Sequence, residues 1–229
     1  LAAEALAAAP VGERPAMVDV LREPHGLLLR YMAEEVIGSE DDDALALLDC
    51  AQVLDGIEPA LADAVGIPVA EQTFARLVRR GVYLEPLPGL EPGRMVLRPL
   101  FRSYLANHRR LEPERVREIQ AAAARWHEAA GEFAQALTYV TRLGDVEWCV
   151  RLLTEHGTRL VEEGAAGTVL AAAELLPAES RTSAIEVLVG DAGLMQGQWD
   201  VALTHYRRAA GNGRPAVVRE RDVPLTLHQ

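Results

Sequence analysis

The sequence contains no lysine, so all 23 of its basic residues are arginine. It has no apolar run near the roughly 18–20 residues that a membrane-spanning helix needs. Its first residues also lack the basic segment that opens a signal peptide. We therefore expect a cytoplasmic protein with no membrane partner. Together with the many alanine, glycine and proline residues, the use of arginine alone is typical of a high-GC bacterial genome.

Cysteine is also scarce. Cys50 and Cys149 lie far apart within helical patterns, and no Cys-x-x-Cys or His-x-x-x-His spacing occurs. Protein metal sites built from these residues usually show such spacings. We predict two small, buried, reduced thiols and no metal site.

The chain is short of positive charge and of catalytic patterns. Its net charge is −11, whereas a phosphate-binding surface needs the opposite sign. The six histidines are scattered, and none pairs with Ser or Cys at a motif spacing. We expect no direct binding of nucleic acid by this chain, no catalytic residues and no enzymatic activity.

The length of 229 residues suffices for one large or two small domains. Because the chain begins at Leu1 rather than Met, we expect a piece of a longer protein. We divide it into an Ala-rich, Pro-interrupted tail of a preceding helical domain (1–25), a domain of helices with a hairpin (26–110), a region of helical repeats (111–215) and an unassigned tail (216–229).

Residues 26–110 predict helices followed by a small hairpin. The apolar patterns place helices at 27–37, 45–54 and 58–65, and a further helix that starts near Pro68 and has its apolar stripe at 74–78. Carboxylates at 40–43 suit a helix N-terminus, where the macrodipole is positive. Two β-type runs, 82–87 and 95–97, flank a Pro/Gly turn and predict a hairpin, and Pro99 then opens another helix. This is the order of a winged helix.

From residue 112 an internal repeat predicts three helical hairpins. The turn glycines Gly131, Gly164 and Gly197 are 33 residues apart. Four other columns agree across the copies: Ala124, Gly157 and Gly190; Ile119, Leu152 and Ile185; Ala136, Val169 and Ala202; Leu137, Leu170 and Leu203. The copies cover about 117–149, 150–182 and 183–215. No single hairpin can bury its apolar stripe, so the copies must stack.

The repeats resemble the tetratricopeptide (TPR) type. The clearest copy reads Gly197-Gln198-Trp199-Asp200-Val201-Ala202-Leu203, with Gly190 before it and Tyr206 and Ala209 beyond it. The resemblance implies a mainly all-α fold, in which a winged-helix domain with a small β-hairpin precedes a TPR-like superhelix. We expect Trp126, Trp148 and Trp199 to pack in the core of the hairpins.

The chain from about residue 20 to about 210 is similar to the central part of MalT-type regulators, which are LuxR-family bacterial transcription activators with a signal-transduction NTPase (STAND). The segments that carry the likeness are 31–36, 77–87, 97–105, 126–131, 136–137, 144–145 and 175–177, in this order and spacing. In that family the winged helix packs on the NTPase and helps to hold the nucleotide. The repeats sense an inducer or partner, and a C-terminal helix-turn-helix binds DNA.

This resemblance implies a regulatory or sensor fragment. It would relay binding of a small effector, protein or peptide to a neighbouring NTPase and to a DNA-binding domain, both absent from this chain. The fragment itself has no G-x-x-x-x-G-K-[ST] loop, so we expect no cofactor in it and ATP or ADP only in the parent protein. Two alternatives stay open: a free-standing TPR-type adaptor, and a DNA-binding winged-helix protein with a helical dimerisation tail.

In the first half of the chain, the candidate contacts with nucleotide or DNA are arginine side chains. The resemblance places a phosphate-facing side chain at Arg98, where the family often has His, and arginine can grip phosphate in a bidentate way. The departure is equally compatible with a loss of nucleotide control. Arg76, Arg79 and Arg80 lie on the helix that would enter DNA in a winged helix, or else on a solvated or interdomain face. A basic stretch from Arg94 to Arg117 suits nucleotide, an acidic neighbour or nucleic acid.

The first helix of each hairpin lines the concave side of a TPR-type superhelix. Counting back from each turn glycine gives the residues expected to line a groove for a ligand or partner: Glu118, Arg125, Glu128, Arg151, Thr154, Thr158, Glu162, Asp191, Leu194 and Met195. This mixed surface suits a small polar effector or a peptide with one apolar anchor. The alternative is that these positions are solvated or pack between repeats.

Overall fold

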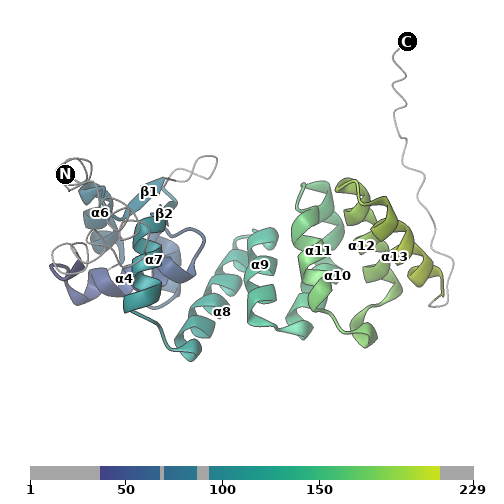
Figure 1. Ribbon diagram of the computed structural model, residues 1–229, viewed down its shortest axis with the longest axis horizontal. Helices are drawn as coiled ribbons and strands as arrows, with labels where there is room; N and C mark the ends of the chain where they lie inside the picture. Colours follow the sequence, from purple (N-terminus) through teal and green to yellow (C-terminus); the bar gives the residue numbers. More distant parts are fainter. Residues whose placement is uncertain (1–36, 68–69, 87–92, 212–229) are drawn as a thin grey trace, which may run out of the picture. The chain divides into compact units, whose positions relative to one another are not determined.

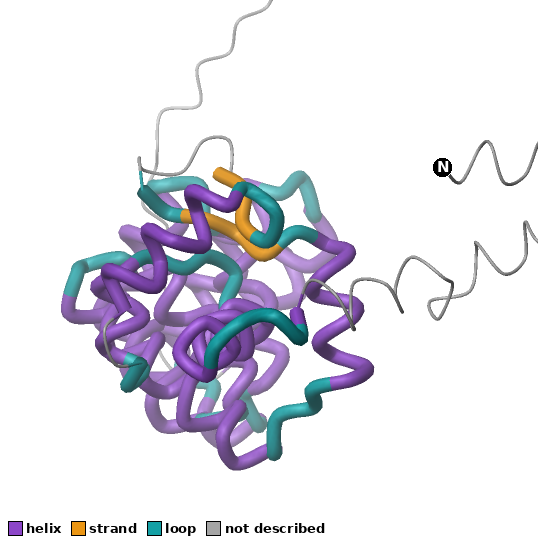
Figure 2. The backbone as a smooth tube through the Cα atoms, turned by 90° about the vertical axis from the view of Figure 1, so that its left-hand side faces the viewer, coloured by secondary structure: helices purple, strands orange, loops and turns teal. Residues whose placement is uncertain are grey.

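The computed structural model describes residues 37–67, 70–86 and 93–211. The expected N-terminal tail, almost all of the helix at 27–37, the turn between the two β-type runs and the tail at 216–229 therefore lie outside the described residues. The described part is mainly helical, with one small two-stranded antiparallel sheet (Figures 1 and 2). This confirms the fold class predicted from the sequence.

The chain divides into two compact units, Leu1–Trp126 and His127–Gln229. The described elements of the first unit are α4 (Asp42–Val53), α5 (Pro59–Ala64), α6 (Ala70–Arg80), β1 (Leu84–Pro86), β2 (Met95–Leu97), α7 (Pro99–His108) and most of α8 (Pro113–Ala129). The second unit contains α9 (Phe133–Leu143), α10 (Val146–Glu162), α11 (Ala166–Leu175), the short 3-10 helix η2 (Ala178–Ser180), α12 (Ser183–Met195) and α13 (Trp199–Gly211).

Local sequence signals start α4, the first described helix of the first unit. The Asp41 side chain accepts a hydrogen bond of 2.9 Å from the backbone N–H of Ala44 and so caps α4. Asp42 and Asp43 follow in the first turn, where negative charge is favourable. The acidic segment is therefore a helix N-terminus, as the sequence predicts.

The small sheet closes over the helices of the first unit. Leu84 pairs with Leu97 and Pro86 with Met95, and the backbone of Ile57 bridges to Met95 on the other edge of β2. Tyr83, just before β1, is fully buried with its ring edge-on to Phe101 of α7, at 4.8 Å between centroids. The core beneath is built from leucines of α4, α6 and α7, all buried: Leu47, Leu48, Leu77 and Leu105.

Glycine turns divide the following helices into hairpins, as the 33-residue period predicts. Gly131, Gly164 and Gly197 have φ angles of 77°, 88° and 71°. These left-handed conformations cost a residue with a side chain more than they cost glycine. The structure places turns at these glycines between α8 and α9, between α10 and α11, and between α12 and α13 (Figure 1).

The column of small residues permits close packing, but not always within one hairpin. A Cβ atom on Gly190 would lie 2.5 Å from Cε1 of Tyr206, on the partner helix of its own hairpin. A Cβ atom on Gly157 would lie 2.2 Å from Cδ2 of Leu188, which belongs to the next hairpin. The same sequence column therefore serves two interfaces, between α12 and α13 and between α10 and α12.

Among the described residues, no helix is both long enough and apolar enough to cross a membrane.

The turn at Gly197 gives a direct test of the repeat. We expect Gly197→Ala to lower the free energy of unfolding by about 1 kcal/mol, because alanine must adopt a positive φ there. Gly167→Ala in α11 is the matched control, since a Cβ atom at Gly167 meets open space and φ is not positive. Urea unfolding followed by circular dichroism measures both. Equal stability of the Gly197 variant and the wild-type chain would contradict this reading of the turn.

Candidate functional site

The predicted groove residues divide between the two units. Glu118 and Arg125 lie in the part of α8 that belongs to the first unit, and Glu118 pairs with Arg115 at 2.9 Å. The other predicted groove residues lie in the second unit, on the end of α8, on α10 and on α12. There α10 packs against α12, so the first helices of consecutive hairpins are neighbours.

Glu128 and Arg151, both predicted groove residues, bind each other. Two guanidinium nitrogens of Arg151 donate to the two carboxylate oxygens of Glu128, at 2.7 and 3.0 Å. The indole nitrogen of Trp148 also donates to Glu128, at 2.8 Å. The hydrogen bond from Arg151, with that from Trp148, holds the pKa of Glu128 below its usual range. This cluster joins the end of α8 to α10.

The remaining groove candidates are exposed but differ in their contacts. The hydroxyl of Thr154 donates to the carbonyl of Val150 in its own helix, at 2.7 Å. Thr158 and Glu162 are exposed on the same helix. Asp191 accepts a hydrogen bond of 2.7 Å from the hydroxyl of Tyr206, which ties α12 to α13.

The last two groove candidates, Leu194 and Met195, are exposed apolar side chains at the end of α12. The three tryptophans also have unlike environments. Trp126 is half-buried beneath the Arg94 guanidinium, 5.7 Å from its ring centre, and Trp148 is half-buried against Glu128. Trp199 is 71% exposed, so the prediction that it packs in the hairpin core is wrong.

Two histidine–carboxylate pairs close hairpins in the second unit, and neither pair was predicted from the sequence. Nδ1 of His127, a buried residue, lies 2.6 Å from the carboxylate of Glu132 across the Gly131 turn. Nδ1 of His205 on α13 lies 2.6 Å from the buried carboxylate of Glu186 on α12. Both pairs connect the two helices of one hairpin, which is a structural role.

Arg98, the predicted nucleotide contact, lies directly after β2 and precedes α7. Its backbone N–H donates to the carbonyl of Tyr83, at 2.9 Å. Its guanidinium pairs with Glu85 of β1 at 3.1 Å and also reaches the carbonyl of Gly81, at 3.5 Å. The side chain is 43% exposed, so it remains open to a further anionic partner on its solvent side.

Two of the three arginines of α6 are engaged by the acidic residues at the start of α4, whereas Arg79 is exposed. Arg76 makes two hydrogen bonds with Asp41, at 2.5 and 2.6 Å, and holds the pKa of this carboxyl down to about 2, with help from the Ala44 N–H. Arg80 pairs with Glu40, whose side chain is almost completely buried and also accepts a hydrogen bond of 2.7 Å from Tyr83. Burial, followed by this hydrogen bond, raises the pKa of Tyr83.

The basic stretch between Arg94 and Arg117 is largely neutralised within the first unit. The ion pairs are Arg94–Glu58, Arg98–Glu85, Arg109–Asp49 and Arg115–Glu118. Arg102 donates instead to the backbone carbonyls of Gln52 and Leu54, at 2.7 and 3.1 Å. Most of this charge therefore supports the fold and is not available to phosphate.

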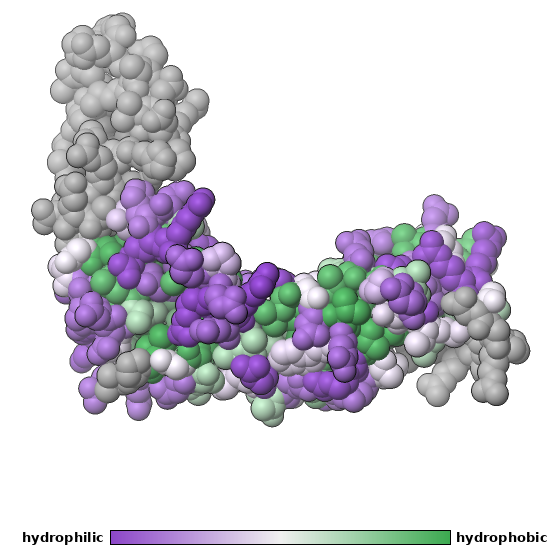
Figure 3. All heavy atoms as spheres, turned by 90° about the horizontal axis from the view of Figure 1, so that it is seen from below, coloured by the Kyte–Doolittle hydropathy of each residue, from purple (hydrophilic) through white to green (hydrophobic). Residues whose placement is uncertain are grey.

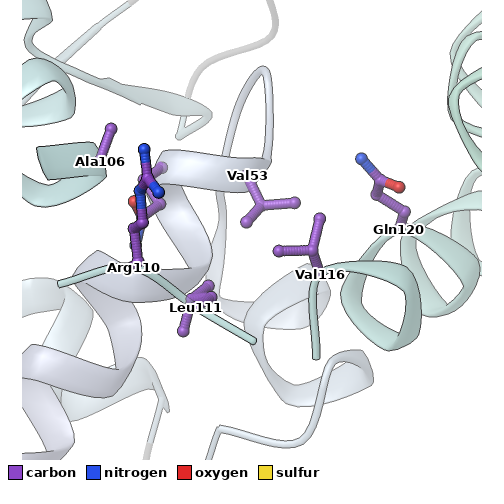
Figure 4. Close-up of a pocket in the computed structure, with 7 residues that line it drawn as sticks. Val53, Ala106, Arg110, Leu111, Val116 and Gln120 are labelled. Carbon is purple, nitrogen blue, oxygen red and sulfur yellow. The ribbon is translucent and has the colours of Figure 1, made fainter. Parts of the chain in front are cut away.

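A shallow pocket of about 350 Å³ lies among α4, α7 and the start of α8 in the first unit (Figure 4). Its wall is apolar where Val53, Ala106, Leu111 and Val116 line it, and polar where Gln52, Arg110 and Gln120 do. Its volume is at the lower end of the usual range for small-molecule sites. None of these residues was a predicted site residue, because they converge only in the folded unit.

The two cysteines are free and buried, as the sequence predicts. Burial raises the pKa of each thiol to about 11, so neither forms a thiolate at neutral pH.

Over 143 residues the chain is 32% identical to a curated protein, the HTH-type transcriptional regulator MalT of Vibrio cholerae. The match covers 61% of this chain and 16% of that protein, so the chain corresponds to a small part of the relative's length. No family model matches the chain. No solved structure gives a significant match.

The Glu128–Arg151 pair predicts how stability depends on pH. The folded-state pKa of Glu128 is lowered, so its contribution is present above the unfolded-state pKa and is lost as pH falls through the folded-state pKa. We expect Glu128→Gln to cost about 1 kcal/mol at pH 7, a value reduced by partial exposure. The loss of stability from about pH 5 to about pH 3 should be smaller in this variant than in the wild-type chain.

Glu155→Gln is the matched control, since Glu155 is more exposed and lies 3.4 Å from Arg151. Thermal unfolding at several pH values separates the two variants. If both variants behave alike, the Glu128 pair does not hold the hairpins together.

Proposed function

We propose that this chain is a regulatory and sensor fragment of a bacterial transcription regulator of the MalT type. The observation that carries the proposal is the 32% identity to MalT over 61% of the chain. The mainly helical fold, with its consecutive helical hairpins, fits a part that binds and relays rather than one that catalyses. The regulator as a whole acts in the cytoplasm.

In this proposal the fragment does not itself read DNA. Arg76 and Arg80, two of the three arginines of α6, are paired with Asp41 and Glu40. The net charge of −11 opposes any approach to DNA. The DNA-binding and NTPase activities belong to other domains of the regulator, and the fragment relays its signal to them.

The effector surface is the exposed side of α10, where Thr154, Thr158 and Glu162 face solvent, and of α12, where Asp191 is exposed. The nucleotide, ATP or ADP, is held by the neighbouring NTPase domain, and the open side of Arg98 is the fragment's contact with its phosphates. The effector is a small molecule, protein or peptide with polar groups that match hydroxyls and carboxylates.

A free-standing adaptor is the second candidate function. The observation that favours it is the group of apolar side chains exposed at the end of the last hairpin, which suits a protein partner.

A titration with DNA tests whether this fragment leaves DNA binding to another domain of the regulator. We expect no sequence-specific binding of duplex DNA by this chain at about 150 mM salt, measured by fluorescence anisotropy. Binding tighter than about 1 µM that disappears in Arg76→Ala with Arg80→Ala would instead make α6 a DNA-reading helix.

A pair of matched threonine variants tests the effector surface. Thr154 on α10 and Thr204 on α13 are both exposed, and each hydroxyl donates to a carbonyl of its own helix, at 2.7 and 2.8 Å. In the full-length regulator we expect Thr154→Arg to abolish the transcriptional response to effector, because the bulky cation occupies the surface. Thr204→Arg should leave the response unchanged. A normal response in the Thr154 variant would remove α10 from the effector surface.

A further inference from the structure

The pocket of the first unit lies where several segments of the chain meet. The end of α4, the helix α7, the linker between α7 and α8, and the start of α8 all line its volume of about 350 Å³ (Figure 4). One face of the described surface mixes hydrophilic areas with smaller apolar patches (Figure 3), so exposed apolar area alone does not mark a binding site. This pocket is distinguished by the way in which apolar and polar side chains share its wall.

The apolar part of the wall is incompletely packed. Val53, Leu111 and Val116 are half-buried, whereas Leu47 of α4 and Leu105 of α7 are fully buried in the core. Apolar side chains around an unfilled space lack the dispersion contacts that further atoms would supply, so a ligand with an apolar body is favoured there. If each water-sized group occupies about 30 Å³, the pocket takes a ligand of roughly ten non-hydrogen atoms.

The polar part of the wall contains one cation. Of the described residues that line the pocket, Arg110 alone carries a charge, and it makes no ion pair or hydrogen bond with any described side chain or backbone group. Its neighbour Arg109, by contrast, is held by both carboxylate oxygens of Asp49, at 2.9 and 3.1 Å. The guanidinium of Arg110 therefore keeps its fork of N–H donors for a ligand, and this fork matches a carboxylate.

Two glutamine amides complete the wall. The amide of Gln120 makes no hydrogen bond within the part of the chain that the structure describes, and Nε2 of Gln52 makes only a long one to a linker carbonyl, at 3.4 Å. In Figure 4, Arg110 and Gln120 lie on opposite sides of the pocket, with Val53 and Val116 between them. The wall thus offers a cation on one side, an apolar middle, and an amide on the other side.

We infer that this pocket binds a small monocarboxylate with an apolar body and a hydroxyl or oxo group at its far end. Arg110 holds the carboxylate by two parallel hydrogen bonds. The apolar body packs on Val53, Leu111 and Val116, and the amide of Gln120 binds the hydroxyl or oxo group. One guanidinium balances one negative charge, and the net charge of −11 opposes a ligand with two or more negative charges. Nucleotides and phosphate esters are therefore disfavoured.

A ligand in this pocket contacts α4, α7 and α8 together. It therefore stabilises the packing of the start of α8 on the other helices of the first unit, because it binds only where these segments converge. The inference goes beyond the proposed function and does not depend on it. The pocket belongs to the first unit, whereas the effector surface belongs to the second, and Arg98 does not line it.

The probe is para-hydroxyphenylacetate, and para-hydroxyphenylacetamide is its matched neutral counterpart. Both are titrated into the full, ¹⁵N-labelled chain, and NMR follows the side-chain amide signals of Gln52 and Gln120. We expect the acid to shift these signals saturably with a Kd on the order of 1 mM, and the amide to bind about tenfold or more weakly. Inorganic phosphate should not displace the acid. Equal affinity for acid and amide, displacement by phosphate, or no saturation by the acid up to about 20 mM would overturn the inference.

Arg110→Gln tests the role of the cation, and Arg117→Gln is the matched control. Arg117 is exposed on α8, does not line the pocket and has no partner among the described residues, so both variants change the net charge equally. We expect Arg110→Gln to weaken binding of the acid by about tenfold or more and Arg117→Gln to leave it unchanged. Equal weakening by both variants would mean that the overall charge holds the acid, and it would contradict the inference. Circular dichroism checks that both variants are folded, and the comparison of acid with amide needs only the wild-type chain.

Discussion

In the described part of the second unit, the helical hairpins pack against one another, and the unit depends on this packing because a single hairpin of this type cannot bury its apolar stripe alone. The hairpins turn at glycines with positive φ, α10 packs on the preceding helix α9, and α12 packs on the preceding helices α10 and α11. Gly157 meets Leu188 across one such interface, and Arg151 binds Glu128 across another. The stabilising contacts are therefore between neighbours along the chain, so that stability accumulates one hairpin at a time.

The turns and the buried columns could be predicted from the sequence because they depend on local properties. A turn with positive φ selects glycine, and the positions 12 before and 5 after it are buried in all three copies, among them Ile119, Leu152 and Val169. The exposure of Trp199 could not be predicted in this way. The repeat pattern shows that a position faces a neighbour, and it does not show whether that neighbour is present.

The candidate site was predicted less completely, because its contacts join distant residues. Arg76 and Arg80 looked available to DNA, but their partners Asp41 and Glu40 lie 35 and 40 residues earlier in the chain. Glu128 and Arg151 were correctly placed on first helices, whereas their mutual pairing depends on how two hairpins stack. The ion pairs of the first unit therefore stabilise its fold. This agrees with the proposal that the fragment relays a signal and leaves DNA binding to another domain.

Hydrogen exchange of the backbone amides tests the dependence on neighbouring hairpins most directly. If each hairpin is stabilised by the next, helices with neighbours on both sides should be the best protected. We predict the slowest exchange in α10 and α11 and distinctly faster exchange in α13, which no further hairpin follows among the described residues. Equal protection of α13 and α10 would mean that each hairpin is stable by itself, and it would contradict the account.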